Sequence, residues 1–320
     1  MIKLSIHFTF SLFGRNRQTR KSKGKLDFCQ AALNSIESLV GIRAKSTIDN
    51  YQTALRSFSS YTKRPLAIED ISPQLMEGYQ RWLTEKGISL NTISCYMRSL
   101  RSLINKIQPE ADSQRLFNNV FTGKERTEKR SLSIEDVSRL RQLTLPSQSS
   151  LSFARDLFLF SFYALGMPFV DIAHLRETQI KNGYIDYRRH KTGQRVCVKL
   201  EPPMLRIINR YHVAGSPYVF PILNDGDGMG MGKGYEAGRA RYNHHLRHLG
   251  KLANVQRKLT SYVARHTWAS TAYHSNVSLP VISKALGHSS PNTTQVYLQA
   301  IDDHSIEAAN RMLIAHLMRV

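Results

Sequence analysis

A short ordered set of residues in the C-terminal third of the chain could act on a phosphate ester. Arg265 lies in the segment SYVARHTW, His288 ends a Leu-Gly-His tripeptide, and Tyr297 lies nine residues after that histidine. A guanidinium matches the shape and charge of a phosphate, a histidine can hold or transfer a proton, and a tyrosine hydroxyl can become a nucleophile. An isolated Arg-His pair carries little information. The order of the whole set, in a strongly basic chain, indicates chemistry at phosphorus.

Two other motifs are weaker candidates for chemistry. The glycine-rich stretch DGDGMGMGKG has Asp227 where a phosphate-binding Walker A loop needs glycine, and Gly234 where it needs serine or threonine. His244 and His248 are one helical turn apart, but the acid of an HExxH zinc helix is absent and no third ligand is evident. We therefore expect a flexible loop, a basic helix face, and neither a metal nor another cofactor.

The elements that must position the ordered set are mostly helical. Ser133 and Asp136 form a capping-box pattern at a helix start, and residues 151–165 are apolar almost all round, which predicts a central buried helix. The one clear β signal is a hairpin, whose strands span residues 184–189 and 195–200. The remainder of this region follows a helical pattern.

The N-terminal part of the chain has a different pattern. Its first 25 residues contain seven Lys or Arg and no acid, which is typical of a basic arm. A helical period follows, and the third predicted helix carries Arg98 and Arg101 on its polar side, so we expect a small four-helix unit with a basic face. A stretch without a sustained period and with many charges then indicates a linker. The expected arm, helical domain, linker and second domain span residues 1–25, 26–108, 109–130 and 131–320.

The balance of charge limits the class of partner. The 320 residues include 45 Lys and Arg against 24 Asp and Glu, a formal net charge of +21, and 41% are hydrophobic. Such a chain can bury a core, so it is no disordered basic tail, and a nucleic-acid backbone is favoured over an anionic membrane surface as its partner. The three cysteines lack metal-binding spacing, which indicates a reducing cytosol, and no apolar stretch is long enough to span a bilayer.

The ordered set resembles the C-terminal signature of the tyrosine recombinase, or phage integrase, family, which is HxxRH followed by LGHxxxxxTxxY. The resemblance extends over about residues 26–302. The segments ARHTWAS, LGHSSPNTTQVY and FYALGMPFVDIAHL are similar in sequence to integrases of conjugative and mobilisable bacterial elements. The family resemblance implies a mainly α (α+β) fold, with an all-helical core-binding domain followed by a mostly helical catalytic domain that contains a small antiparallel sheet.

The resemblance implies a role for each matching residue. Tyr297 is the expected nucleophile, which attacks a scissile phosphate to form a 3′-phosphotyrosyl link and releases a 5′-hydroxyl. Arg265 and His288 are expected to bind the non-bridging oxygens, because they stabilise the negative charge that develops there. Lys191, in the hairpin turn, matches the lysine that protonates the leaving 5′-oxygen.

Two positions depart from the family pattern. Tyr262 stands where the signature has its first histidine, and a phenol can donate a hydrogen bond but is a poor base at neutral pH. The family's first arginine is also missing, because Pro168 occupies its usual position and Leu165 its position in the mobile-element branch. Strand alternation predicts that Arg189 projects with Lys191, so Arg189 is the candidate replacement. Weaker candidates are Arg188 and Arg176.

The resemblance also implies partners. We expect duplex DNA held between the two domains, a homo-tetramer on two DNA sites, accessory DNA-bending proteins in some settings, no membrane, and a place in the bacterial cytoplasm at the nucleoid. The apolar face of residues 304–320 suits docking on a neighbouring subunit or on its own chain. Candidate DNA-binding residues are Arg98, Arg101, Lys124, Arg188 and Arg241.

Three functions remain open at this point. The first is a site-specific recombinase, in which integration, excision and inversion share one chemistry. The second is a recombinase-derived DNA-binding protein that has lost cleavage, which the two departures motivate. The third is a DNA-relaxing enzyme of the type IB topoisomerase kind.

Overall fold

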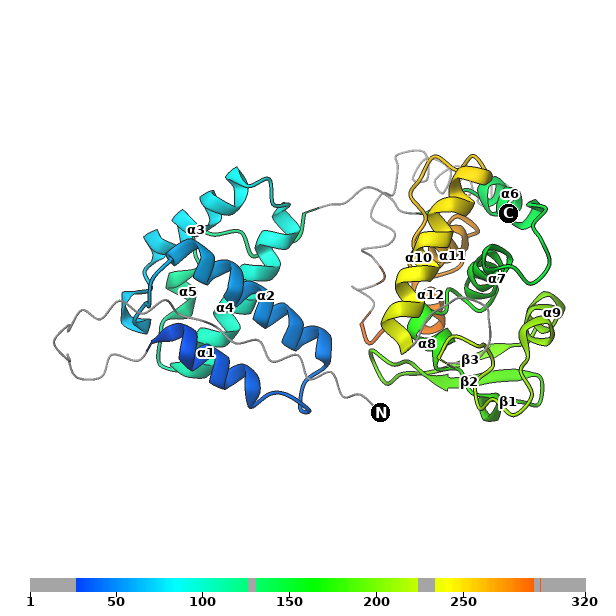
Figure 1. The fold of residues 1–320 in the computed structure, drawn as a ribbon, viewed down its shortest axis with the longest axis horizontal. Helices are drawn as coiled ribbons and strands as arrows, with labels where there is room; N and C mark the ends of the chain where they lie inside the picture. Colours follow the sequence, from blue (N-terminus) through cyan, green and yellow to red (C-terminus); the bar gives the residue numbers. More distant parts are fainter. Residues whose placement is uncertain (1–26, 126–130, 224–233, 291–293, 295–320) are drawn as a thin grey trace, which may run out of the picture. The chain divides into compact units, whose positions relative to one another are not determined.

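The computed structural model describes residues 27–125, 131–223, 234–290 and residue 294 (Figure 1). The chain divides into two compact units, Met1–Thr127 and Glu128–Val320, each with its own hydrophobic core. Among the helices in these described ranges, none is long and apolar enough to cross a lipid bilayer.

The first unit is entirely helical in its described part. Asp27 caps the first helix by accepting a hydrogen bond from the amide of Gln30, and Ser72 caps the third, which starts with Pro73. Phe58 and Tyr79 pack edge to face at 5.1 Å in the core. The elements are α1 Phe28–Glu37, α2 Lys45–Thr62, the 3₁₀ turn η1 Ile68–Asp70, α3 Pro73–Glu85, α4 Leu90–Ile107 and α5 Ser113–Leu116.

The first unit extends further along the chain than the expected boundary near residue 108. Phe117 and Val120 are buried in its core. Ser94 Oγ donates to the carbonyl of Gly123 at 2.6 Å, and the side chain of Asn91 bonds the backbone N–H and C=O of Glu125. Two apolar side chains and polar bonds to α4 therefore hold part of the expected linker at 109–130 against the first unit, although this segment has no helical periodicity.

The second unit is mainly helical with one small sheet, which confirms the predicted fold class. The helix α7, which is buried along most of its length, lies at its centre and packs against α6, α9, α10 and α11 (Figure 1). Ser133 and Asp136 form the predicted capping box at the start of α6. The elements are α6 Ile134–Gln142, α7 Ser150–Tyr163, α8 Phe169–Ala173, the 3₁₀ turn η2 Glu177–Gln179, β1 Ile180–Lys181, β2 Tyr184–Arg188, β3 Arg195–Lys199, α9 Pro202–Tyr211, α10 Gly234–Leu252, α11 Val263–His274 and α12 Leu279–Ala285.

The sheet is antiparallel in the order β1-β2-β3, and β2 pairs with β3 through the register Asp186 to Cys197. This is the predicted hairpin, one residue shorter on each strand. The sequence analysis missed β1, since two residues are too few to show alternation.

Candidate active site

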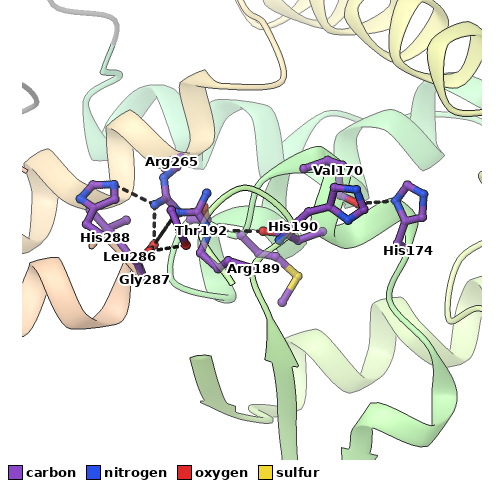
Figure 2. A network of polar contacts seen from close by, with 12 residues as sticks. Val170, His174, Arg189, His190, Thr192, Arg265, Leu286, Gly287 and His288 are labelled. Atoms are coloured by element: carbon purple, nitrogen blue, oxygen red, sulfur yellow. Dashed lines mark hydrogen bonds and ion pairs between the residues drawn. The ribbon is translucent and has the colours of Figure 1, made fainter. Parts of the chain in front are cut away.

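Three segments of the second unit meet at one place: the loop between β2 and β3, the first turn of α11, and the turn at residues 286–288 that follows α12 (Figure 2). They bring Arg189, Arg265 and His288 together. The sequence predicted all three as candidate catalytic residues.

Arg265 is almost fully buried, with 1% of its surface exposed. Its Nη1 donates to the carbonyl of Gly166 at 3.0 Å, and its Nη2 donates to the carbonyl of Leu286 at 2.5 Å and lies 3.0 Å from His288 Nε2. Gly166 has φ 70°, and a Cβ on it would lie 2.9 Å from Arg265 Cα. Only glycine suits this position, because it allows both the left-handed backbone and the close approach of α11.

His288 is held between Arg265 and Thr294. A guanidinium can only donate, so Nε2 of His288 accepts, and its proton lies on Nδ1, which donates to Thr294 Oγ1 at 2.7 Å. Burial, followed by the positive charges of Arg265, Arg189 and Lys191, lowers the pKa of His288 to about 4. The imidazole is therefore neutral at physiological pH in a strongly positive site.

We expect His288 to titrate near pH 4 in DNA-free protein and at higher pH once a phosphate is bound. The anion cancels part of the positive field that disfavours the imidazolium. Because the unfolded chain binds this proton with a pKa of about 6.5, His288 makes the fold less stable as the pH falls from about 6.5 to about 4. NMR titration of the imidazole, assigned with His288→Asn, measures both values. An ordinary histidine pKa without DNA would contradict the described site.

Arg189 does not project with Lys191, contrary to the expectation from strand alternation. Its side chain is 4% exposed, whereas Lys191 is exposed to solvent. The strand β2 ends at Arg188, and Arg189 closes the loop through its N–H to Gln194 O and its C=O to Gly193 N. The inward alternation of Ile185 and Tyr187 thus continues to Arg189 and stops before Lys191.

The side chain of Arg189 reaches the turn at residues 286–288. Its Nη1 donates to Leu286 O at 2.9 Å and lies 3.4 Å from Gly287 O, and its Nε lies 3.4 Å from a carboxylate oxygen of Asp171 (Figure 2). A Cβ on Gly287, which has φ 60°, would lie 2.5 Å from Arg189 Cδ, so glycine is required here as well.

Two residues that the sequence analysis missed also fix the hairpin loop. Asp171, on α8, is 1% exposed and accepts the N–H of His190 at 2.9 Å besides its ion pair with Arg189. Thr192 Oγ1 donates to Gly287 O at 3.0 Å, which ties the loop to the turn (Figure 2). An acid in the apolar segment FVDIAHL was the available signal, because a buried carboxylate needs a cationic or N–H partner.

The two positions that depart from the family signature lie close to the start of α11 and of α8. Tyr262 occupies the N-cap position of α11, three residues before Arg265, with its ring 5.4 Å from that of His266. Leu165 is partly buried against the main core with φ 57°, and Pro168 precedes α8 as its N-cap. The two positions at which we expected the family's first arginine therefore hold apolar side chains. Tyr297, residues 304–320 and most of the glycine-rich stretch lie outside the described residues.

The five candidate DNA-binding residues lie at the surface of their units. Arg98 and Arg101 are three residues apart on α4 and lie at the edge of its buried stripe, which includes Ser94 and Met97. Four of the five are exposed and Arg101 is half-buried. The exposed four are Arg98, Lys124, Arg188 and Arg241.

Comparisons with known proteins find relatives of both units. The profile of the Phage integrase family matches residues 130–304, and that of the Phage integrase SAM-like domain matches residues 26–107. Tyrosine recombinase XerA of Pyrococcus furiosus is 23% identical over 84% of this chain and 88% of its own length. Tyrosine recombinase XerD of Rhizobium meliloti is 25% identical over 81% of this chain and 86% of its own length.

Solved structures share the fold. The Tn1549 transposon integrase, solved in complex with transposon right end DNA, aligns with a TM-score of 0.67 at 14% identity over 90% of this chain and 100% of that chain. A lambda integrase dimer bound to a core site aligns with a TM-score of 0.66 at 13% identity over 85% of this chain and 96% of that chain. The family profile covers more than half of the chain, from residue 130 to residue 304. The chain belongs to the phage integrase family and is a tyrosine recombinase, an enzyme that cleaves and rejoins DNA.

Proposed function

We propose that this recombinase uses Tyr297, Arg265, His288 and Lys191 as its catalytic residues, with Tyr262 as a further hydrogen-bond donor. The observation that carries the proposal is the meeting of Arg265, His288 and the Lys191 loop at the turn formed by residues 286–288. The positive charge of Arg265 and Lys191, which adds to the effect of burial in lowering the pKa of His288, suits a group that gains negative charge in the transition state.

Each residue has a distinct part in the proposed reaction. The hydroxyl oxygen of Tyr297 attacks the scissile phosphorus and loses its proton to water, while the bond from phosphorus to the 5′-oxygen breaks. The Lys191 ammonium gives a proton to that oxygen, so a 5′-hydroxyl leaves. Arg265 donates to the non-bridging oxygens. Attack by a 5′-hydroxyl on the phosphotyrosine reverses these steps and joins the strands, which requires no metal or external energy source.

A nicked duplex tests this proposal directly. If the fragment that carries the 5′-hydroxyl is short enough to diffuse away after cleavage, the covalent intermediate accumulates and is detected on a denaturing gel. The alternative of a DNA-binding protein without cleavage predicts binding with no adduct, and no comparison favours it. A topoisomerase-like enzyme would form the adduct on duplexes of any sequence.

Both units are proposed to bind duplex DNA through cationic side chains. Arg98 and Arg101 present two guanidinium groups on α4, and the bond from Ser94 to Gly123 places Lys124 beside the start of that helix. Arg188 and Arg241 are the corresponding exposed cations of the second unit. The family assembles on DNA, so we propose a homo-tetramer on two sites, with accessory DNA-bending proteins, acting at the bacterial nucleoid.

DNA affinity is expected to fall steeply with salt, because bound Lys and Arg displace condensed counterions from the duplex. Alanine at Arg98 or Arg101 should weaken binding to all sequences and reduce the slope of log affinity against log salt by roughly one for each phosphate that the variant no longer neutralises. Fluorescence anisotropy at several salt concentrations measures the slope. Arg43→Ala, in the loop between α1 and α2, is the matched control and should keep the wild-type slope. Equal slopes in all variants would remove α4 from the interface.

A further inference from the structure

Two guanidinium groups converge on one oxygen atom in the second unit. Arg189 Nη1 and Arg265 Nη2 both donate to the carbonyl of Leu286, at 2.9 and 2.5 Å (Figure 2). Each arginine also has a second anchor, which is Asp171 for Arg189 and the carbonyl of Gly166 for Arg265. The two cationic groups are therefore held side by side by the surrounding protein.

We propose that Arg189 is a catalytic residue that binds the scissile phosphate together with Arg265, with a phosphate oxygen replacing Leu286 O when DNA is bound. This inference rests on the proposed function of the site around Arg265 and His288. It gives the enzyme a second guanidinium from the β2–β3 loop, although Leu165 and Pro168 carry no charge.

The two arginines are buried to nearly the same extent. Arg265 is 1% exposed and Arg189 is 4% exposed, so a phosphate must displace the same neighbouring group to reach either guanidinium. This group is the carbonyl of Leu286, which is a neutral acceptor. A phosphate carries a full negative charge and makes stronger hydrogen bonds to guanidinium than a carbonyl does.

The charges of the site favour an anion there. Two like charges that meet in a buried place repel each other, and a phosphate between them removes that cost. Asp171 lies at the Nε side of Arg189 and also accepts the N–H of His190, so it neutralises the stem side of the guanidinium while Nη1 points to the turn. The charge of Arg189 already acts at the site, since it contributes to the lowered pKa of His288.

A purely structural role for Arg189 predicts a different result. The stem of Arg189 packs against Gly287, and Nη1 supports the turn that carries His288. Substitution would then misplace the turn and slow cleavage of any substrate. A lowered rate alone is therefore insufficient, and the test must ask whether Arg189 acts on the charge of the phosphate.

The experiment compares single-turnover cleavage of a nicked duplex with that of the same duplex carrying a neutral methylphosphonate at the scissile position. Arg189→Gln, which keeps part of the stem and one donor, should cost about a hundredfold or more on the phosphate, the scale of one lost transition-state donor. On the methylphosphonate the loss should be at least about tenfold smaller, because the charge that Arg189 stabilises is absent. Equal losses on both substrates would overturn the proposal.

Controls separate folding from catalysis. Asp171→Asn combined with Arg189→Gln avoids an unpaired buried carboxylate, and this double variant should show the same dependence on substrate charge. Arg195→Gln, an exposed arginine of the same hairpin that is paired with Asp186, should stay within about twofold of wild type on both substrates.

Chemical rescue gives a second measurement. Added guanidinium ion should restore cleavage of the phosphate by Arg189→Ala and leave Arg195→Gln unchanged. If neither wild type nor Arg189→Gln cleaves the methylphosphonate, the guanidinium experiment decides. Restored cleavage by Arg189→Ala supports the proposal, and failure to restore it overturns the proposal. Wild-type protein that forms no adduct on the phosphate duplex would instead refute the proposed function of the whole site.

Discussion

A Tyr297→Phe variant is expected to form no covalent adduct with a nicked duplex and to keep a DNA affinity within about twofold of wild type. The substitution removes one hydroxyl, which is the only atom group able to attack phosphorus from this side chain and a small part of a large cationic interface. Adduct formation should fall below roughly one part in 10⁴, the scale of a lost nucleophile. A denaturing gel measures the adduct, and anisotropy measures the affinity.

Tyr184→Phe is the matched control, because Tyr184 is an exposed tyrosine on β2 of the same unit. It should form the adduct at the wild-type rate. An adduct that persists in Tyr297→Phe would show that another tyrosine is the nucleophile, and Tyr262 at the start of α11 is the next candidate.

The fold was predictable where local patterns decide it. The capping box of Ser133 and Asp136, the central buried helix α7 and the β2–β3 hairpin each depend on residues close together in the sequence, and all three are present. Phe117 and Val120 join the core of the first unit, whose other buried members lie between Phe28 and Ile104. Such contacts produce no helical or strand periodicity in the sequence.

The site was predictable in its residue types and less so in its contacts. The order of Arg265 and His288 along the chain indicated that they act together, and they lie within hydrogen-bond distance. The prediction that Arg189 and Lys191 project together was wrong, since Arg189 keeps the inward alternation of Ile185 and Tyr187 and Lys191 does not. The parts played by Asp171, Thr192 and the carbonyl of Leu286 depend on contacts across 18 to 97 positions of sequence, which no local motif encodes.

A Lys191→Ala variant is expected to cleave ordinary DNA about a thousandfold more slowly, within the range of general acid catalysis. Lys191 is exposed at the loop between β2 and β3, and Thr192 beside it is bonded to Gly287, which holds the loop at the turn that carries His288. The measurement uses a second duplex in which sulfur replaces the leaving 5′-oxygen. A thiol has a pKa of about 8.5, far below that of an alcohol, so the sulfur leaves without a proton.

The sulfur substrate should therefore restore the rate of Lys191→Ala to within about tenfold of wild type, because the step that needs the acid has been removed. Lys199→Ala, an exposed lysine at the end of β3, is the matched control and should match wild type on both duplexes. Thr192→Val should lose activity on the oxygen substrate and recover it on the sulfur substrate, because its bond to Gly287 positions the acid and not the phosphate. A Lys191→Ala defect that is equally large on both duplexes would show that this lysine acts on the phosphate or on DNA binding, and the general acid would have to come from another residue near the turn at residues 286–288.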